Sequence, residues 1–479
     1  MKEKKSTTFE GNVLRLISGT GIGQVVSLAV SPVLTRLFAP EAFGMAAIFT
    51  AITGIIGSLV CLRYEQAIVL PKDDDEAANI LYLCLLVAMV VSGSTFLLIT
   101  YFDSGFYDIE HLIQVGGYLW LVPLSVLISG IYFIFQFWNT RTKNYTRISI
   151  STVSGSIANT GTSLSLGSLG HVTGGSLILA SIGGQIVSSV MLAFQIIRAD
   201  GKFLLKSFSL RKILLCIKRY RKFPLYGSWS ILLGNGAWLL PTILMGAYFS
   251  PVFVGYYALG FRILQVPTSL IGSSIGQVFL QESAEAQING TLPELLERLF
   301  EKLVALSLLP FLMLMVIGQD MYAFVFGSEW REAGLYTQIL APWALLWFLS
   351  SPLTCLFTVM ERQKLQLRWN VANFLTRVLA IFVGVYFNSS ILTVILLGFF
   401  GVIVYGYKIV LSFRIAKTQL ANSMKYFTKQ LFISAVPTGF VFILTEFEVS
   451  TFLSVSAASM IVFINIAFFS SKALKAIRK

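Results

Sequence analysis

Long apolar segments alternate with short polar connections along almost the whole chain. A helix needs roughly 20 predominantly apolar residues to cross a bilayer, and these segments have about that length. Only helices and closed barrels satisfy their backbone hydrogen bonds in lipid, and continuous apolar runs indicate helices. We therefore predict an all-α polytopic membrane protein. Its fourteen predicted spans lie near residues 12–38, 41–63, 78–101, 114–137, 150–168, 173–197, 225–249, 254–280, 300–318, 337–360, 371–388, 391–413, 430–446 and 450–470.

The composition agrees with this pattern and excludes a soluble enzyme. Of the 479 residues, 56% are hydrophobic and only 12% are charged, whereas an ordinary globular domain carries roughly 25% charged residues. The spans leave only short connections, which excludes a sizeable catalytic domain outside the membrane. The four cysteines and two histidines follow no disulfide or metal-ligand spacing, so we expect no metal and no cofactor.

The positions of the basic residues predict the orientation of the chain. The net charge is +13, and nearly all Lys and Arg residues of the loops fall on the same side as the Lys-rich N-terminus. The loops on the opposite side hold only Arg331. Basic residues accumulate in cytoplasmic loops. We therefore expect both termini to be cytoplasmic.

Two short patterns recur in the two halves of the chain. Phe, Pro, Gly and Ala of segment 38–47 reappear at the same spacing in segment 249–258, and the basic segment 141–147 is echoed by segment 362–368. Together they favour a six-helix unit that is repeated once. Six is an even number, so both copies keep the same orientation and are related by a pseudo-two-fold axis along the membrane normal.

This repeat predicts four parts of the chain. They are an N-terminal six-helix lobe at 1–197, a basic cytoplasmic linker at 198–224, a C-terminal six-helix lobe at 225–413, and two additional spans with a basic tail at 414–479. In the linker, Leu210, Ile213, Leu214 and Ile217 recur at helical spacing, which predicts an amphipathic helix on the inner leaflet. Positive-inside charge explains the basic residues beside it, and we expect no nucleic-acid partner.

The ionisable residues inside the spans are the first candidates for function. No Asp or Glu lies centrally in any span, whereas Arg262 and Arg377 lie deep in theirs. Placing an arginine at mid-membrane costs roughly 2.5–3.5 kcal/mol, which a wet cavity that receives an anion would offset. Hydrogen bonds from these arginines to backbone carbonyls are the alternative. A guanidinium binds phosphate or pyrophosphate through two parallel hydrogen bonds.

Three further cations lie nearer to the span ends. Arg36 is a candidate for binding the substrate or for capping its own helix. We expect Arg15 and Lys408 to extend to the membrane surface, as long basic side chains near helix ends do.

Small polar residues form a second group of candidates. The fifth span is rich in Ser, Thr, Gly and Asn, including Asn159, and Asn235 lies between two glycines in the seventh span. Such residues either line a hydrated path for sugar hydroxyls, permit bending, or let helices pack closely. The candidate substrate-binding residues are thus Arg36, Asn159, Asn235, Arg262 and Arg377. The acidic run 73–76 is expected to begin the third helix, where its charges complement the helix dipole.

Three segments resemble motifs of a known family. Thr35–Gly44, which includes Pro40 and Gly44, is similar to its first-loop signature. Arg63–Pro71, which includes Glu65, is similar to its second-loop pattern, and Phe326–Gly334 to its segment between spans nine and ten. On these motifs the chain resembles the bacterial polysaccharide (oligosaccharide-lipid) flippases of the multidrug/oligosaccharidyl-lipid/polysaccharide exporter superfamily. The motif residues carried over are Pro40, Gly44, Arg63, Glu65 and Pro71.

The resemblance implies a function. Undecaprenyl-pyrophosphate-linked oligosaccharide repeat units would be moved across the bacterial plasma (inner) membrane by alternating access, for the synthesis of O-antigen lipopolysaccharide, capsule or exopolysaccharide. The implied partners are this substrate and membrane lipids, with a polysaccharide polymerase as a further candidate partner. We expect a monomer.

Two other functions compete with this one. A multidrug cation exporter of the same architecture usually keeps a carboxylate inside the membrane, and none is visible in these spans. A membrane glycosyltransferase or polymerase would leave the internal repeat unexplained, and the predicted outer loops are short.

Overall fold

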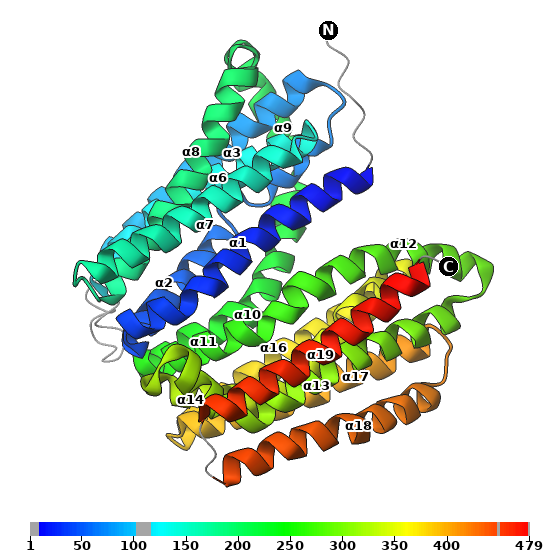
Figure 1. Cartoon of the computed structure of the whole chain (residues 1–479). Helices are drawn as coiled ribbons and strands as arrows, with labels where there is room; N and C mark the ends of the chain where they lie inside the picture. The colour runs from blue at the N-terminus through cyan, green and yellow to red at the C-terminus, as the bar shows by residue number, and fades with distance from the viewer. Residues whose placement is uncertain (1–8, 102–115, 448–450, 478–479) are drawn as a thin grey trace. The chain divides into compact units, whose positions relative to one another are not determined.

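The computed structural model describes residues 9–101, 116–447 and 451–477. Within these ranges the chain is helical and contains no strand, so the predicted all-α polytopic fold is confirmed (Figure 1). Each of the fourteen predicted spans overlaps a helix or consecutive helices; residues 114–115 and 450, where two of these spans were predicted to begin, lie outside the described residues. In the described part, ten helices are long and apolar enough to cross a membrane, or eleven if one bent pair counts as a span.

Residues Met1–Gly255 form the first of two compact units. Its helices are α1 (Phe9–Leu37), α2 (Pro40–Gly57), α3 (Asp74–Tyr101), α6 (Val122–Arg141), α7 (Tyr145–Ser168), α8 (Gly174–Ser207), α9 (Leu210–Arg219) and α10 (Ser228–Tyr248), with the short segments η1 (Tyr64–Val69), η3 (Leu119–Leu121) and η4 (Phe223–Gly227).

Residues Tyr256–Lys479 form the second unit. It begins inside α11 (Pro251–Pro267) and continues with α12 (Ser273–Asn289), α13 (Leu292–Phe326), α14 (Arg331–Ser350), α15 (Leu356–Val359), α16 (Gln363–Tyr386), α17 (Ser390–Ile415), α18 (Leu420–Glu446) and α19 (Thr451–Ile477). Its short segments are η5 (Thr268–Gly272), η6 (Ser328–Trp330) and η7 (Pro352–Cys355). Buried residues of α13, α18 and α19 share one apolar core, so the last two helices pack on α13.

The unit boundary differs in place from the predicted linker. Helix α10 packs on α2 within the first unit, although the repeat assigned residues 225–413 to the second lobe. The predicted linker itself is largely helical, because α8 continues to Ser207 before α9 begins at Leu210. The division of the chain into four parts, which was inferred from the sequence repeat, therefore stays a prediction.

Small residues in α7 let three helices of the first unit approach closely. Helix α7 packs against both α1 and α8. A Cβ atom on Gly155 of α7 would lie 2.8 Å from the Gly184 carbonyl oxygen of α8, and a Cβ atom on Gly184 would lie 2.7 Å from the Gly155 carbonyl oxygen. The hydroxyls of Ser151 and Ser156 donate to backbone carbonyls of α8 and α1. These contacts favour the packing interpretation of the polar fifth span.

The two copies of the repeated Pro-x-x-x-Gly pattern meet each other within the first unit. A Cβ atom on Gly44 in α2 would lie 1.7 Å from the carbonyl oxygen of Pro251, at the start of α11. A Cβ atom on Gly255 would lie 1.9 Å from the carbonyl oxygen of Pro40. The contact is reciprocal, as expected for equivalent segments around a local two-fold axis. Only glycine at both positions permits it.

Candidate functional site

Three charged side chains are fully buried among the described residues. Arg377 in α16 and Lys408 in α17 are 6% and 5% exposed and belong to the second unit, whereas Glu65 in η1 is 6% exposed and belongs to the first. Burying a charge is costly unless surrounding groups compensate it. Each of these residues is therefore a candidate for a functional role.

Aromatic rings surround the Arg377 guanidinium. Its central carbon lies 4.8 Å from the ring centre of Trp343 in α14, which is a favourable cation–π distance. The charge also acts on the hydroxyls of Tyr257 and Tyr405, from α11 and α17. Three helices besides α16 thus contribute to the surroundings of one buried arginine.

Lys408 is buried in the same unit, so its predicted extension to the membrane surface is wrong. Its ammonium nitrogen donates to the Thr354 hydroxyl at 2.8 Å and lies 4.3 Å from the ring centre of Trp369 and 5.7 Å from that of Tyr405. The sequence placed Lys408 near a span end, but α17 continues to Ile415. Its ammonium is held by Thr354 and these aromatic rings.

We call this set of residues the cation–aromatic cluster; its members are Tyr257, Trp343, Trp369, Arg377, Tyr405 and Lys408. Tyr405 links the two cations, because it lies beside both. Arg377 was a predicted candidate for binding the substrate, whereas Lys408 was not. The available signal was the spacing of Tyr405 and Lys408, which places them on one helix face.

A stack of near-parallel rings adjoins the cluster. Phe261 of α11 and Trp347 of α14 have ring centres 5.7 Å apart at 15°, and Trp343 lies 5.7 Å from Trp347 at 8°. Phe261 and Trp347 keep part of their surface exposed. The predicted site residue Arg262 follows Phe261 in α11 and is partly buried. Aromatic faces and guanidinium groups therefore occur together in this unit.

The other predicted substrate-binding residues lie in the first unit. Arg36 is exposed in the last turn of α1, the position at which a cation complements the helix dipole. Asn159 is partly buried, and a Cβ atom on Gly184 would lie 2.8 Å from its Cβ atom, so it contributes to packing of α7 on α8. Asn235 is partly buried in α10. The side chain of Arg15 is outside the described residues.

The second motif forms a strained and buried corner. Leu62 and Arg63 have φ values of 47° and 66°, a region that residues other than glycine rarely adopt. Arg63 pairs with Glu65 at 3.4 Å. Burial raises the pKa of the Glu65 carboxyl, and the Arg63 charge opposes this only in part. Within the described structure, Glu65 Oε2 and Arg63 Nε are buried without a hydrogen bond.

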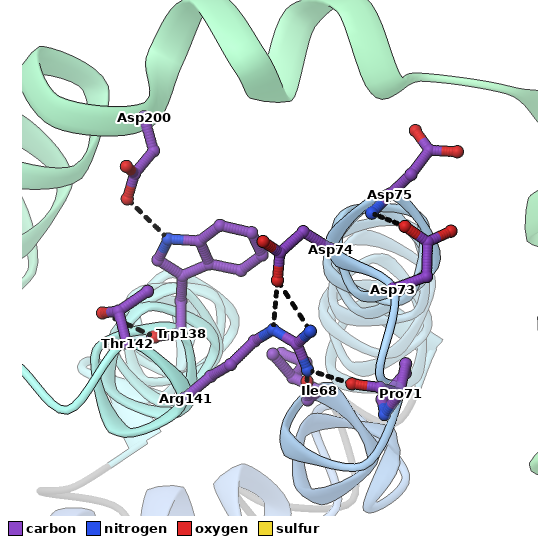
Figure 2. Close-up of polar contacts among 9 residues, drawn as sticks. All are labelled: Ile68, Pro71, Asp73, Asp74, Asp75, Trp138, Arg141, Thr142 and Asp200. Carbon is purple, nitrogen blue, oxygen red and sulfur yellow. Dashed lines mark hydrogen bonds and ion pairs between the residues drawn. The ribbon is translucent and has the colours of Figure 1, made fainter. Parts of the chain in front are cut away.

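Pro71, the next residue of the second motif, belongs to a polar cluster at the start of α3 (Figure 2). Arg141 of α6 donates to the Pro71 carbonyl oxygen at 2.7 Å and to that of Ile68 at 3.1 Å. The same guanidinium pairs with Asp74 at 2.7 Å. This arrangement fixes the turn that precedes α3.

The acidic run begins α3 as predicted, because the helix starts at Asp74. It also binds basic side chains of α9: Lys212 pairs with Asp75, and Arg219 pairs with Glu76 at 2.8 Å. Among the described residues, no group of three or more His, Cys, Asp or Glu side chains is placed to hold a metal ion. The run thus acts as an ion-pairing site for the protein's own cations.

Comparisons with known proteins agree with the fold. The family described as "Polysaccharide biosynthesis protein" matches residues 33–334. The structure titled "Lipid II flippase MurJ, inward closed conformation" has a TM-score of 0.70 at 13% identity and covers 96% of this chain and 99% of that chain.

Two structures of MATE-family multidrug resistance transporters of the MOP superfamily are also similar. The inward-facing one has a TM-score of 0.56 at 16% identity, covering 84% of this chain and 94% of its own. The outward-facing one has a TM-score of 0.51 at 15% identity, covering 88% and 99%. At these identities the likeness shows the fold. No curated protein matches the sequence.

Proposed function

We propose that this chain, which belongs to the polysaccharide biosynthesis protein family, moves undecaprenyl-pyrophosphate-linked oligosaccharides from the inner to the outer leaflet of a bacterial plasma membrane. Family membership was predicted from the loop motifs, and the match over residues 33–334 confirms it. The transporter fold supports alternating access as the mode of transport. The transported oligosaccharides would then be used to build O-antigen, capsule or exopolysaccharide.

The buried pair of cations is the observation that carries this proposal. Arg377 and Lys408 lie within the cation–aromatic cluster, with cation–π contacts and the Thr354 hydroxyl around them. Both positive charges are held away from bulk water. A pyrophosphate group carries the complementary charge, and the guanidinium of Arg377 can bind it through two hydrogen bonds.

The neighbouring ring stack suits the sugar part of the same substrate. Phe261 and Trp347 keep partly exposed faces, and flat apolar surfaces are suited to the apolar faces of pyranose rings. Arg262 adds a further guanidinium on α11. A single ligand with a charged pyrophosphate and an adjoining sugar would use both kinds of group.

A multidrug cation exporter is the alternative, because transporters of that function share the fold. Such a protein needs negative charge where its cationic substrate binds. The fully buried charged residues among those described are two cations in spanning helices and one carboxylate, Glu65, in the loop segment η1. This balance of charge favours an anionic substrate.

Replacement of the buried arginines tests the proposal in cells. Arg377→Ala and Arg262→Ala should each lower surface polysaccharide at least tenfold at normal protein level. Arg377→Lys should also impair output, because lysine keeps the charge but lacks the two-donor fork.

Arg331→Ala is the matched control, since Arg331 is exposed at the start of α14 and pairs with Asp320 at 3.0 Å. It should keep wild-type output. Normal polysaccharide from both alanine variants at normal expression would overturn the proposed role of these arginines.

A further inference from the structure

Helix α9 presents a surface that its contacts with the protein leave uncovered. Its buried side consists of Ile213 and Cys216, with Tyr220 directly after the helix. This side packs on α3. The sequence analysis assigned Ile213 to one apolar face with Leu210, Leu214 and Ile217. The structure separates them, because Ile213 faces the protein and the other three are exposed.

Several polar contacts fix α9 to the first turns of α3. Lys212 pairs with Asp75, and Arg219 pairs with Glu76. The Tyr220 hydroxyl donates to Glu76 at 3.0 Å. These bonds hold one side of α9 against α3, so the opposite side has a fixed direction.

The turn before α9 is fixed in the same way. The side-chain amide of Asn79 in α3 donates to the Ser207 carbonyl oxygen at 2.8 Å and accepts from the Ser209 backbone amide at 3.0 Å. The helix therefore cannot rotate freely about its axis.

The outward side of α9 is an apolar stripe with cations along one edge. At 3.6 residues per turn, Leu210, Leu214 and Ile217 fall within about 60° of arc. Leu210 and Leu214 are each 64% exposed. Arg211 and Lys218 follow on one side of the stripe and are exposed. None of the ion pairs found in the described part of the chain includes either of them.

The position of α9 relates this stripe to the bilayer. The candidate span of α3 begins at Asp74, and the ion pairs bind α9 to the residues directly after it. A helix fixed beside the first turn of a span lies at the depth of the lipid headgroups. An apolar stripe with adjacent cations is the pattern by which helices bind an acidic membrane surface.

We propose that the outward stripe of α9 binds acidic phospholipids. Leu210, Leu214 and Ile217 enter the boundary between headgroups and acyl chains, and Arg211 and Lys218 contact the anionic headgroups. The basic residues of α9 thus divide into two classes. Lys212 and Arg219 are neutralised by α3, whereas Arg211 and Lys218 face the lipid. This surface does not depend on which substrate the protein transports.

A fluorescent reporter in the full-length protein tests this inference. Leu214→Cys is labelled with an environment-sensitive maleimide dye in a Cys355→Ala background, because the other three cysteines are buried. Burial also raises the pKa of the Cys216 thiol to about 11, which disfavours the reactive thiolate at neutral pH. The protein is placed in nanodiscs of phosphatidylcholine alone or with increasing phosphatidylglycerol.

The reporter should move to an apolar environment, with brighter and blue-shifted emission, as phosphatidylglycerol increases. Arg211→Gln with Lys218→Gln should lower the affinity of this surface for phosphatidylglycerol by roughly thirty-fold, the effect of removing two basic residues from an acidic surface. Arg211→Lys with Lys218→Arg keeps both charges and should restore the response.

Lys425→Gln with Lys429→Gln is the control for net charge, since it removes two exposed cations from α18. It should leave the reporter unchanged. Emission that is insensitive to phosphatidylglycerol would overturn the inference. An equal loss of response in the α9 and α18 double variants would also overturn it, because only total charge would then matter.

Discussion

At the scale of single residues, burial distinguishes charges that look alike in the sequence. Arg377 and Arg36 both follow a Leu-Thr pair, yet Arg377 lies over the Trp343 ring and Arg36 is exposed at the end of α1. The depth of a residue within a span could be predicted from the hydropathy pattern. The ring under Arg377 comes from another helix, so no pattern within α16 reveals it.

Lys408 supports a prediction at this scale. Lys408→Gln should lower polysaccharide output at least tenfold, because it removes one of the two buried cations of the cluster while keeping a side chain that can bind Thr354. Lys417→Gln provides the matched control, since Lys417 lies in the turn after α17. The measurement is surface polysaccharide normalised to protein level. Normal output from Lys408→Gln would exclude Lys408 from the site.

Glu65 predicts a specific dependence of stability on pH. Burial raises the pKa of its carboxyl, so the ionised form is disfavoured in the folded protein. The contribution of Glu65 to stability is therefore complete below the ordinary glutamate pKa, about 4.3, and is lost as the pH rises through the raised value.

Glu65→Gln should consequently raise the melting temperature relative to wild type by about 1–3 °C at pH 7.5, and the difference should vanish near pH 4. Arg63 keeps contact with water, because its side chain is 22% exposed. Melting curves of the purified protein at both pH values provide the measurement. A variant that melts lower at pH 7.5 would show that the ion pair with Arg63 dominates over burial.

At the scale of helices, the close approach of α2 and the start of α11 supports the strongest prediction about packing. Gly44→Ala and Gly255→Ala each place a methyl group less than 2 Å from a carbonyl oxygen. Both variants should lose most of their folded protein or of their transport.

Gly161→Ala is the matched control, because a Cβ atom there would meet nothing within 4 Å. It should be neutral or slightly stabilising, since alanine favours a helix over glycine. Fluorescence-detected gel filtration and surface polysaccharide measure both effects. Wild-type behaviour of Gly44→Ala would contradict the described crossing.

The helices themselves could largely be predicted from the sequence, because a membrane span is long and uniformly apolar. The end of α8 could not, because residues 198–207 are polar enough to read as a loop although they continue the helix. Only one part of the role of the acidic run 73–76 could be predicted from the sequence. Its place at a helix start follows from the dipole, whereas its pairing with Lys212 and Arg219 depends on how a distant segment folds back.

At the scale of the whole molecule, the distribution of basic residues predicts which loops face the cytoplasm. A cysteine at Glu332, in the first turn of α14, should react with a membrane-impermeant maleimide added to intact cells. A cysteine at Lys218, in α9, should react only after the membrane is permeabilised. Both positions are exposed, so a difference in labelling reports sidedness. The reverse pattern would contradict the predicted cytoplasmic termini.

Translocation by the purified protein tests the central claim most directly. Proteoliposomes are loaded with a fluorescent undecaprenyl-pyrophosphate-linked oligosaccharide, and its appearance in the opposite leaflet is followed for wild type, Arg377→Ala and the control Arg331→Ala. Wild type and Arg331→Ala should translocate the lipid, and Arg377→Ala should do so at least tenfold more slowly. Equal rates with Arg377→Ala, or transport of an organic cation in place of the lipid, would contradict the account.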